Sequence, residues 1–155
     1  MKTLYDVRHY LNSIPDINRG GCAIAVLAMY RWLRKNKPNA NYGFVFNYYS
    51  QSKAEKNQKE SEKYGAISSC GHALLWNKKS NELRDSTTRK SNTHWELISK
   101  EECLFFDDEK ILVNAINSGN WRHIFDREQW VEIIGDTLDV DLSDVEVNYV
   151  SSFPF

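Results

Sequence analysis

Cys22 lies where the sequence could place a reactive thiol. It follows Gly20 and Gly21 and opens a run, residues 23–30, without a charged or strongly polar side chain. A run that is apolar on every side predicts a buried helix, and two glycines let the backbone turn sharply into it. Free N–H groups and the helix dipole favour a thiolate at such a helix start. The alternative is that Cys22 is a small core residue, because free cysteines are often buried.

A β-hairpin further along the chain could supply a base for this thiol. Residues 72–76 and 81–85 are expected to form two strands, joined by a loop of residues 77–80. Four-residue loops are common in hairpins, and this one sets His72 directly opposite Asp85. Opposed residues have β-carbons about 4.5–5.5 Å apart on the same face of the sheet, so the imidazole and the carboxylate would touch.

The same register predicts how the hairpin reaches the cysteine. It sets Leu74 opposite Leu83 on the face that carries His72 and Asp85, which marks this face as the buried one. Packing of the sheet on the apolar helix would then bring His72 over Cys22. Asp85 would fix one tautomer of His72 and stabilise its imidazolium. A thiol with a base that a third group orients is the arrangement of thiol acyl transfer.

The remaining thiols are weaker candidates, and no metal site is expected. Cys70 lies in a loop without a helix dipole, and Cys103 follows Glu101 and Glu102, whose charges disfavour a thiolate. Cys70 is close to His72, but no further cysteine or histidine completes a zinc spacing. The sequence therefore predicts neither a metal nor a cofactor.

The bulk composition limits the classes of partner. The chain has 155 residues, 20 basic and 21 acidic side chains and 41% hydrophobic residues. This predicts a single folded domain, residues 1–155, and gives no reason to expect nucleic acid or an anionic membrane as partner. The start of the chain has no apolar signal segment, and no run is long enough to span a membrane. We therefore expect a soluble, cytoplasmic protein.

Periodicity predicts an α+β protein with one core. The segment 50–64 is polar and alternates in charge, so it is either an exposed helix or a solvated loop. In the last helix, Trp130, Ile133 and Ile134 are expected to face inward. Helices are expected at 2–12, 22–35, 108–117 and 126–138, and further strands at 42–49, 95–98, 104–106 and 145–150.

Three short motifs carry a family resemblance. Gly-Gly-Cys-Ala-Ile-Ala at residues 20–25 resembles the helix start of papain-like cysteine peptidases. Gly-His-Ala-Leu-Leu-Trp at 71–76 and Arg-Asp-Ser-Thr at 84–87 look most like the transglutaminase-like branch of that superfamily. The resemblance implies a Cys-His-Asp triad, on a central apolar helix packed against an antiparallel sheet. In it Cys22 is the nucleophile, His72 the general base and Asp85 its orienting partner.

The groups that would bind the substrate carbonyl are less clearly marked. Papain has a glutamine a few residues before its cysteine, whereas this chain has Asn18 and Arg19 there. The backbone N–H of Cys22 can supply one oxyanion donor. Asn18, Gly21 and Trp76 are the candidates for the remaining oxyanion and substrate contacts, although a tryptophan in a strand is more often a core residue.

Two functions are consistent with these residues. The first is a thiol-dependent enzyme that cleaves or modifies an amide bond of a protein or peptide through an acyl-enzyme. Cysteine peptidases, glutamine deamidases and transglutaminases share the steps up to that intermediate. The alternative is a non-catalytic interaction domain that keeps a papain-like fold and binds a partner through residues 50–64 or the acidic segment 139–146.

Overall fold

The described part of the protein is a mixed α+β structure. The computed structural model describes residues 1–65, 67, 71–87, 99–118 and 124–147. The elements, in chain order, are α1 (Leu4–Asn12), α2 (Cys22–Asn36), β1 (Tyr42–Asn47), α3 (Gln51–Tyr64), β2 (His72–Asn77), β3 (Glu82–Arg84), the short 3-10 helix η1 (Lys100–Glu102), β4 (Cys103–Phe106), α4 (Glu109–Asn117) and α5 (Arg127–Leu138). The α+β class predicted from the sequence is confirmed.

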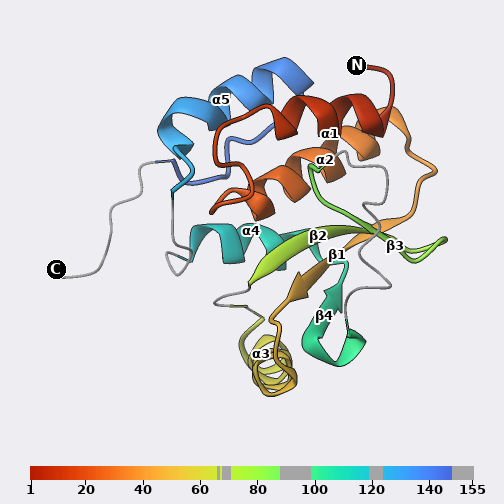
Figure 1. Cartoon of the computed structure of the whole chain (residues 1–155), viewed down its shortest axis with the longest axis vertical. Helices are drawn as coiled ribbons and strands as arrows, with labels where there is room; N and C mark the ends of the chain where they lie inside the picture. Colours follow the sequence, from red (N-terminus) through yellow and green to blue (C-terminus); the bar gives the residue numbers. More distant parts are fainter. Residues whose placement is uncertain (66, 68–70, 88–98, 119–123, 148–155) are drawn as a thin grey trace, which may run out of the picture.

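Helix α2 is the centre of the fold. Every residue from Cys22 to Met29 is buried, as the apolar run predicts. The helix contacts β2 of the sheet and is also contacted by α1, α4 and α5 (Figure 1). Because these elements surround α2, a helix at this position needs apolar side chains on all sides.

The sheet has four antiparallel strands in the order β3-β2-β1-β4. Its two faces carry different side chains, because successive residues of a strand point to opposite sides. Phe44, Phe46 and Leu75 belong to the main core with α2. Val45 and Leu74 belong to a second, smaller cluster. The helix-facing side and the second side are therefore distinct environments.

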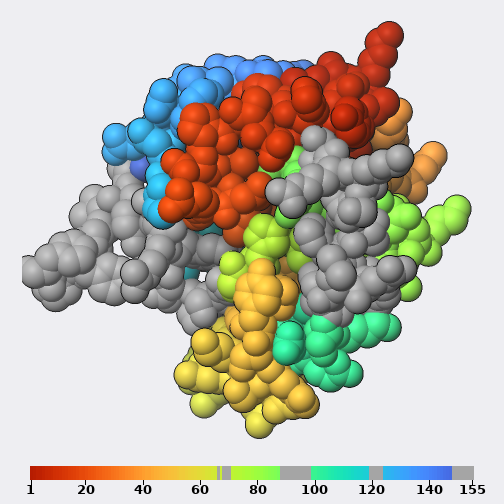
Figure 2. Space-filling model, viewed as in Figure 1, coloured from red at the N-terminus to blue at the C-terminus, as the bar shows by residue number. Residues whose placement is uncertain are grey.

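Helix α3 accounts for the polar segment 50–64. Ser50 caps its start by accepting a hydrogen bond from the Lys53 N–H, and Gly65 ends it in the left-handed conformation. Only Ala54 and Asn57 of the helix are buried, and it contacts η1 and β4. Figure 2 shows α3 (yellow) at the opposite end of this face from the N-terminal segment (red). Of the two alternatives for this segment, the exposed helix is correct.

Three details differ from the sequence-based expectations or lie outside the described residues. Ile133 is 43% exposed and does not face inward, whereas Ile134 is fully buried as predicted. Within the described residues, 145–147 form no strand. The predicted strand 95–98 and residues 148–150 lie outside the described part of the chain. One more difference, in the hairpin register, bears directly on the site and is considered there.

Candidate active site

The loop before α2 places Cys22 at the first residue of the helix. Gly20 has φ of 102°, a left-handed conformation that favours glycine. Gly21 is the N-cap residue, and a β-carbon there would lie 2.7 Å from the Ile17 carbonyl oxygen and 2.8 Å from Cγ of Phe125. The two glycines are thus required for different reasons, and together they fix where the thiol lies.

The start of α2 differs from the starts of the other α-helices. Among the described residues no side chain caps α2, so its first N–H groups are not bonded by a capping oxygen. Helices α1, α3, α4 and α5 each have a capping side chain, from Thr3, Ser50, Asp108 and Asp126 respectively. Cys22 therefore lies at an uncapped positive helix end, which favours negative charge on its sulfur.

His72 is held at the beginning of β2, beside the end of β1. It pairs with Asn47 in the antiparallel ladder, and the preceding Gly71 N–H donates to the Asn47 carbonyl at 2.9 Å. A β-carbon on Gly71 would lie 2.6 Å from Cε2 of Tyr49. The close approach at Gly71 lets the strand begin where His72 can reach the helix.

The side chains of His72 and Asp85 form a hydrogen-bonded pair. His72 Nε2 lies 3.0 Å from Asp85 Oδ2, and the side chains are 18% and 8% exposed. The other carboxylate oxygen, Oδ1, accepts a hydrogen bond from the Thr87 N–H at 2.8 Å. His72 also forms a side-chain hydrogen bond with Cys22. With Nε2 on Asp85, Nδ1 is the ring nitrogen left for the thiol.

These contacts change the protonation of the imidazole. Burial by itself would lower the pKa of His72, but the hydrogen bonds to Asp85 and Cys22 outweigh it and raise the pKa from 6.5 to about 9. His72 is therefore an imidazolium at neutral pH. A fixed cation beside Cys22 stabilises negative charge on the sulfur.

The hairpin register that led to this pair is wrong by two residues. Asn77 pairs with Glu82 and Trp76 with Leu83, so the loop is 78–81 and not 77–80. Extending this register by one residue would set Asp85 opposite Leu74, two residues along β2 from His72. The contact is diagonal, and it forms because residues 85–87 leave the strand after Arg84.

The predicted face of the hairpin is also wrong. Leu74 and Leu83 form the second cluster with Val45, whereas Cys22 belongs to the main core. Strict alternation along β2 would group His72 with Leu74, on the side away from α2. The imidazole nevertheless bonds to Cys22, and His72 is the first residue of the strand, where alternation constrains a side chain least.

Two other predicted contacts lie in different places. Asn18 Nδ2 donates to the fully buried Ser86 hydroxyl at 2.8 Å, while Asn18 Oδ1 is buried without a partner among the described residues. Asn18 therefore ties the loop before Cys22 to the residue after Asp85, and its role as an oxyanion donor stays a prediction. Trp76 packs against Phe105 in the second cluster and is not part of the group at Cys22.

One buried residue at the site has no signal in the sequence. Arg8 of α1 is 6% exposed, and its Nε donates to the Asp85 carbonyl at 2.8 Å. Its Nη2 donates to the Thr87 carbonyl. Arg8 lies 77 and 79 residues before these partners in the sequence. A single arginine beside Val7 on an amphipathic helix would be predicted to face solvent.

The other thiols can be compared with Cys22. Burial, together with Glu102 and Glu101, raises the pKa of Cys103 to about 11, so the predicted effect of the neighbouring carboxylates is confirmed. Cys103 therefore stays protonated at neutral pH. Cys70 lies outside the described residues.

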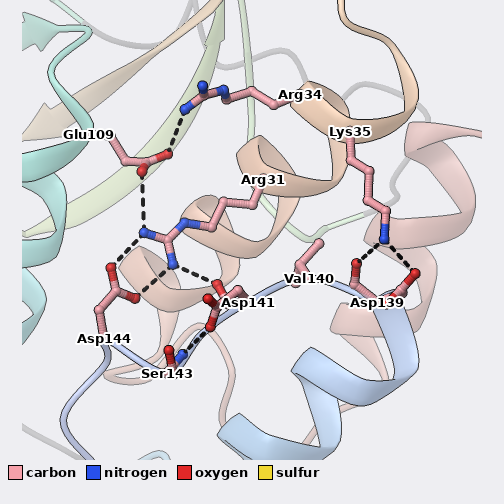
Figure 3. A pocket seen from close by; sticks show the side chains of 9 residues that line it. All are labelled: Arg31, Arg34, Lys35, Glu109, Asp139, Val140, Asp141, Ser143 and Asp144. Atoms are coloured by element: carbon pink, nitrogen blue, oxygen red, sulfur yellow. Dashed lines mark hydrogen bonds and ion pairs between the residues drawn. The ribbon is translucent and has the colours of Figure 1, made fainter.

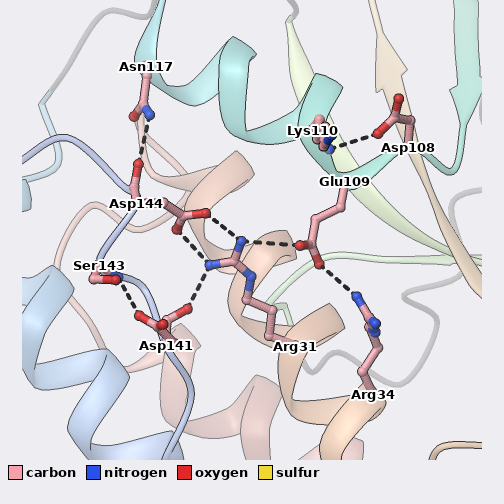
Figure 4. Close-up of polar contacts among 9 residues, drawn as sticks. All are labelled: Arg31, Arg34, Asp108, Glu109, Lys110, Asn117, Asp141, Ser143 and Asp144. Atoms are coloured by element: carbon pink, nitrogen blue, oxygen red, sulfur yellow. Dashed lines mark hydrogen bonds and ion pairs between the residues drawn. The ribbon is translucent and has the colours of Figure 1, made fainter.

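A cavity lies elsewhere, beside the C-terminal half of α2. It has a volume of about 810 Å³ and is lined mainly by charged side chains (Figure 3). Arg31 donates to both carboxylate oxygens of Asp144 at 2.7 Å and to Glu109 at 3.2 Å, and Lys35 pairs with Asp139 (Figure 4 shows the Arg31 contacts). The acidic segment thus neutralises Arg31 and Lys35 of α2. Arg31 in turn joins α2 to α4 through Glu109.

These ion pairs account for the charges that line the cavity. The hydrogen bonds to Asp144 raise the pKa of Arg31, and Arg31 in turn lowers the pKa of Asp144. Both groups therefore stay charged at neutral pH. The charged side chains of this cavity therefore belong to a stabilising network of ion pairs. We take the group at Cys22 as the candidate active site.

The described residues contain neither a candidate metal site nor a membrane-spanning helix. Among the described residues no group of three or more histidine, cysteine or carboxylate side chains could hold a metal ion. No helix in that part of the chain is both long and apolar enough to cross a bilayer.

No family model, no curated protein and no solved structure matches the chain. The geometry of the site therefore carries the functional argument.

Proposed function

We propose that the protein is a thiol-dependent acyl-transfer enzyme of papain-like or transglutaminase-like type, with Cys22 as nucleophile. The observation that carries the proposal is one chain of contacts: Asp85 bonds His72, and His72 bonds Cys22 at the start of a helix. A cysteine that is only part of the core would need neither a charged base nor an uncapped helix end beside it.

The chemistry follows from the roles that these groups can take. The Cys22 thiolate attacks an amide carbonyl carbon, a C–S bond forms, and the carbonyl electron pair moves to oxygen. The imidazolium of His72 gives its proton to the leaving nitrogen as the C–N bond breaks, which leaves a thioester on Cys22. Water or an amine then attacks the thioester carbonyl carbon, and His72 takes up the proton of that nucleophile. A new C–O or C–N bond forms as the C–S bond breaks, which regenerates the Cys22 thiolate.

The start of α2 provides the first donor for the oxygen that becomes negative. The backbone N–H groups there have no capping side chain among the described residues, and the helix dipole points its positive end at the same place. Asp85 does not take part in proton transfer in this scheme. It holds the tautomer and orientation of His72 and stabilises its positive charge.

The proposed substrate is an amide of a protein or peptide. Hydrolysis, glutamine deamidation and transamidation use the same acyl-enzyme, and they differ only in the leaving group and in the nucleophile that resolves it. Cys22 is 5% exposed, so the reacting carbonyl must reach the sulfur through a narrow approach. Small activated esters are suited to probing such a thiol.

Acylation by p-nitrophenyl acetate tests the proposal. The wild-type chain should give a burst of p-nitrophenol, and peptide mapping should find the acetyl group on Cys22. The Cys22→Ala variant should lose the burst, whereas Cys103→Ala should keep it. Equal acetylation of Cys22 and Cys103, or an unchanged burst in Cys22→Ala, would favour the non-catalytic interaction domain.

A further inference from the structure

Arg8 is a buried cation whose bonds go to the backbone beside Asp85. The residue is 6% exposed, and desolvation lowers its pKa from the ordinary value. Among the described residues it forms no salt bridge with a carboxylate. Burying a guanidinium is costly unless its donors are satisfied, so its two bonds to carbonyls matter for where it can lie.

The two accepting carbonyls lie on either side of Ser86. Arg8 Nε donates to the Asp85 carbonyl at 2.8 Å, and Nη2 donates to the Thr87 carbonyl. Strand β3 ends at Arg84, and residues 85–87 belong to none of the described strands. The planar fork of the guanidinium bridges the two carbonyls and fixes them relative to α1.

This clamp acts on the orientation of the Asp85 carboxylate. The Thr87 N–H donates to Asp85 Oδ1 at 2.8 Å, which leaves Oδ2 for His72 at 3.0 Å. If Thr87 moved, the carboxylate would lose the bond that selects which oxygen meets the imidazole. The guanidinium also interacts electrostatically with the charge of Asp85.

We propose that Arg8 is a positioning residue of the candidate active site, whose guanidinium clamps residues 85–87 so that the Asp85 carboxylate stays on His72. The chain of groups from α1 to α2 alternates in sign: the Arg8 cation, the Asp85 anion, the His72 cation and the Cys22 sulfur. The value of Arg8 for catalysis rests on the proposed function. The clamp itself, and its effect on His72, do not depend on that function.

Several charged or titratable groups act on this chain and must be kept constant in a test. Tyr5 and Arg84 interact electrostatically with Arg8, in addition to Asp85. Both Cys22 and Asp85 act on His72. Arg84 is itself bonded to Glu82 on its own strand. The test therefore changes Arg8 alone and leaves these residues unaltered.

The pKa of His72, followed by NMR in the full chain under reducing conditions, measures the clamp. In Arg8→Gln the pKa should fall by about one unit or more, a tenfold or larger change in the proton affinity. Arg8→Lys should show the same fall, because one ammonium cannot hold two carbonyls in a fork. Arg19→Gln, which removes an exposed arginine from the loop before Cys22, should leave the pKa of His72 unchanged.

Two results would overturn the proposal. One is a folded Arg8→Gln whose His72 pKa equals that of the wild type. The other is an Arg8→Lys that keeps the wild-type pKa while Arg8→Gln loses it, because charge alone would then suffice without the clamp.

The wild-type protein gives a reading that does not depend on whether the variants fold. A through-hydrogen-bond coupling should join Arg8 Nε to the carbonyl carbon of Asp85, and its absence would refute the clamp. Failure of the proposed function would look different: Cys22 of the wild type would not be acylated, while the pKa of His72 would still respond to Arg8.

Discussion

The pair formed by His72 and Asp85 predicts how the stability of the protein depends on pH. The folded protein binds the His72 proton with a pKa of about 9, against 6.5 for the unperturbed group. The contribution to the free energy of unfolding is therefore fully present below pH 6.5 and is lost as the pH rises through about 9. At about 1.36 kcal/mol for each pKa unit, the difference is about 3 kcal/mol.

The prediction is tested by removing the imidazole. Urea unfolding of wild type and His72→Gln should be compared at several values between about pH 6 and about pH 10, under reducing conditions. The stability difference between the two proteins should shrink by about 3 kcal/mol across that range. Because the His72 side chain is only 18% exposed, solvent screening should reduce this free-energy difference only slightly.

An exposed histidine provides the control. His9 on α1 is exposed, so His9→Gln should leave the pH dependence of the wild type nearly unchanged. A difference between wild type and His72→Gln that stays constant from pH 6 to pH 10 would refute the reasoning. It would mean that Asp85 and Cys22 do not hold the proton on His72.

Three further predictions concern the residues that hold the site and α2 in place. Gly21→Ala should cost about 1–3 kcal/mol of unfolding free energy by urea titration and should slow alkylation of Cys22, since the new methyl group would lie 2.7 Å from the Ile17 carbonyl oxygen; a variant as stable and reactive as wild type would contradict this. Arg31→Met should lower the free energy of unfolding by about 2 kcal/mol in low salt and by less in high salt. Arg34→Met should change it little, because Arg34 contacts Glu109 at 3.5 Å and its side chain is 64% exposed. Equal effects of the two substitutions would refute the role given to Arg31. Asn18→Ala should lower the free energy of unfolding by about 1–2 kcal/mol, because it removes the partner of the buried Ser86 hydroxyl. An unchanged urea midpoint would argue against a stabilising hydrogen bond between Asn18 and Ser86.

The helices could be predicted because their signals are local. The apolar run that begins after Cys22 gives α2 almost to the residue, and the polar segment 50–64 is helical within the bounds set by Ser50 and Gly65. Whether that polar segment is helix or loop depends on the capping residues at its two ends more than on its charges.

The hairpin register could not be derived from loop length alone. A four-residue loop is present, but it begins one residue later, because the Asn77 side chain accepts hydrogen bonds from the Lys79 and Ser80 N–H groups. Asn81 closes the turn with φ of 60°. Asparagine tolerates that conformation, and its presence at the end of the turn is the signal that would have corrected the register.

The residues of the proposed triad could be named from the sequence, but the geometry that joins His72 and Asp85 could not. His72 and Asp85 do pair, through a diagonal contact instead of a direct one. Arg8 could not have been found, since its partners at residues 85 and 87 lie far away in the sequence and only the packing of α1 brings them together. A buried arginine that bonds backbone carbonyls leaves no pattern in the chain.

The rate at which iodoacetamide labels each cysteine tests the central claim most directly. The claim is that the His72 imidazolium and the start of α2 activate Cys22. With limiting reagent at neutral pH and mass mapping, Cys22 should label faster than Cys70 and Cys103, and Asp85→Asn should remove most of that advantage. If Cys22 labels no faster than the other two cysteines in the wild type, the activated thiol and the enzyme built on it are refuted.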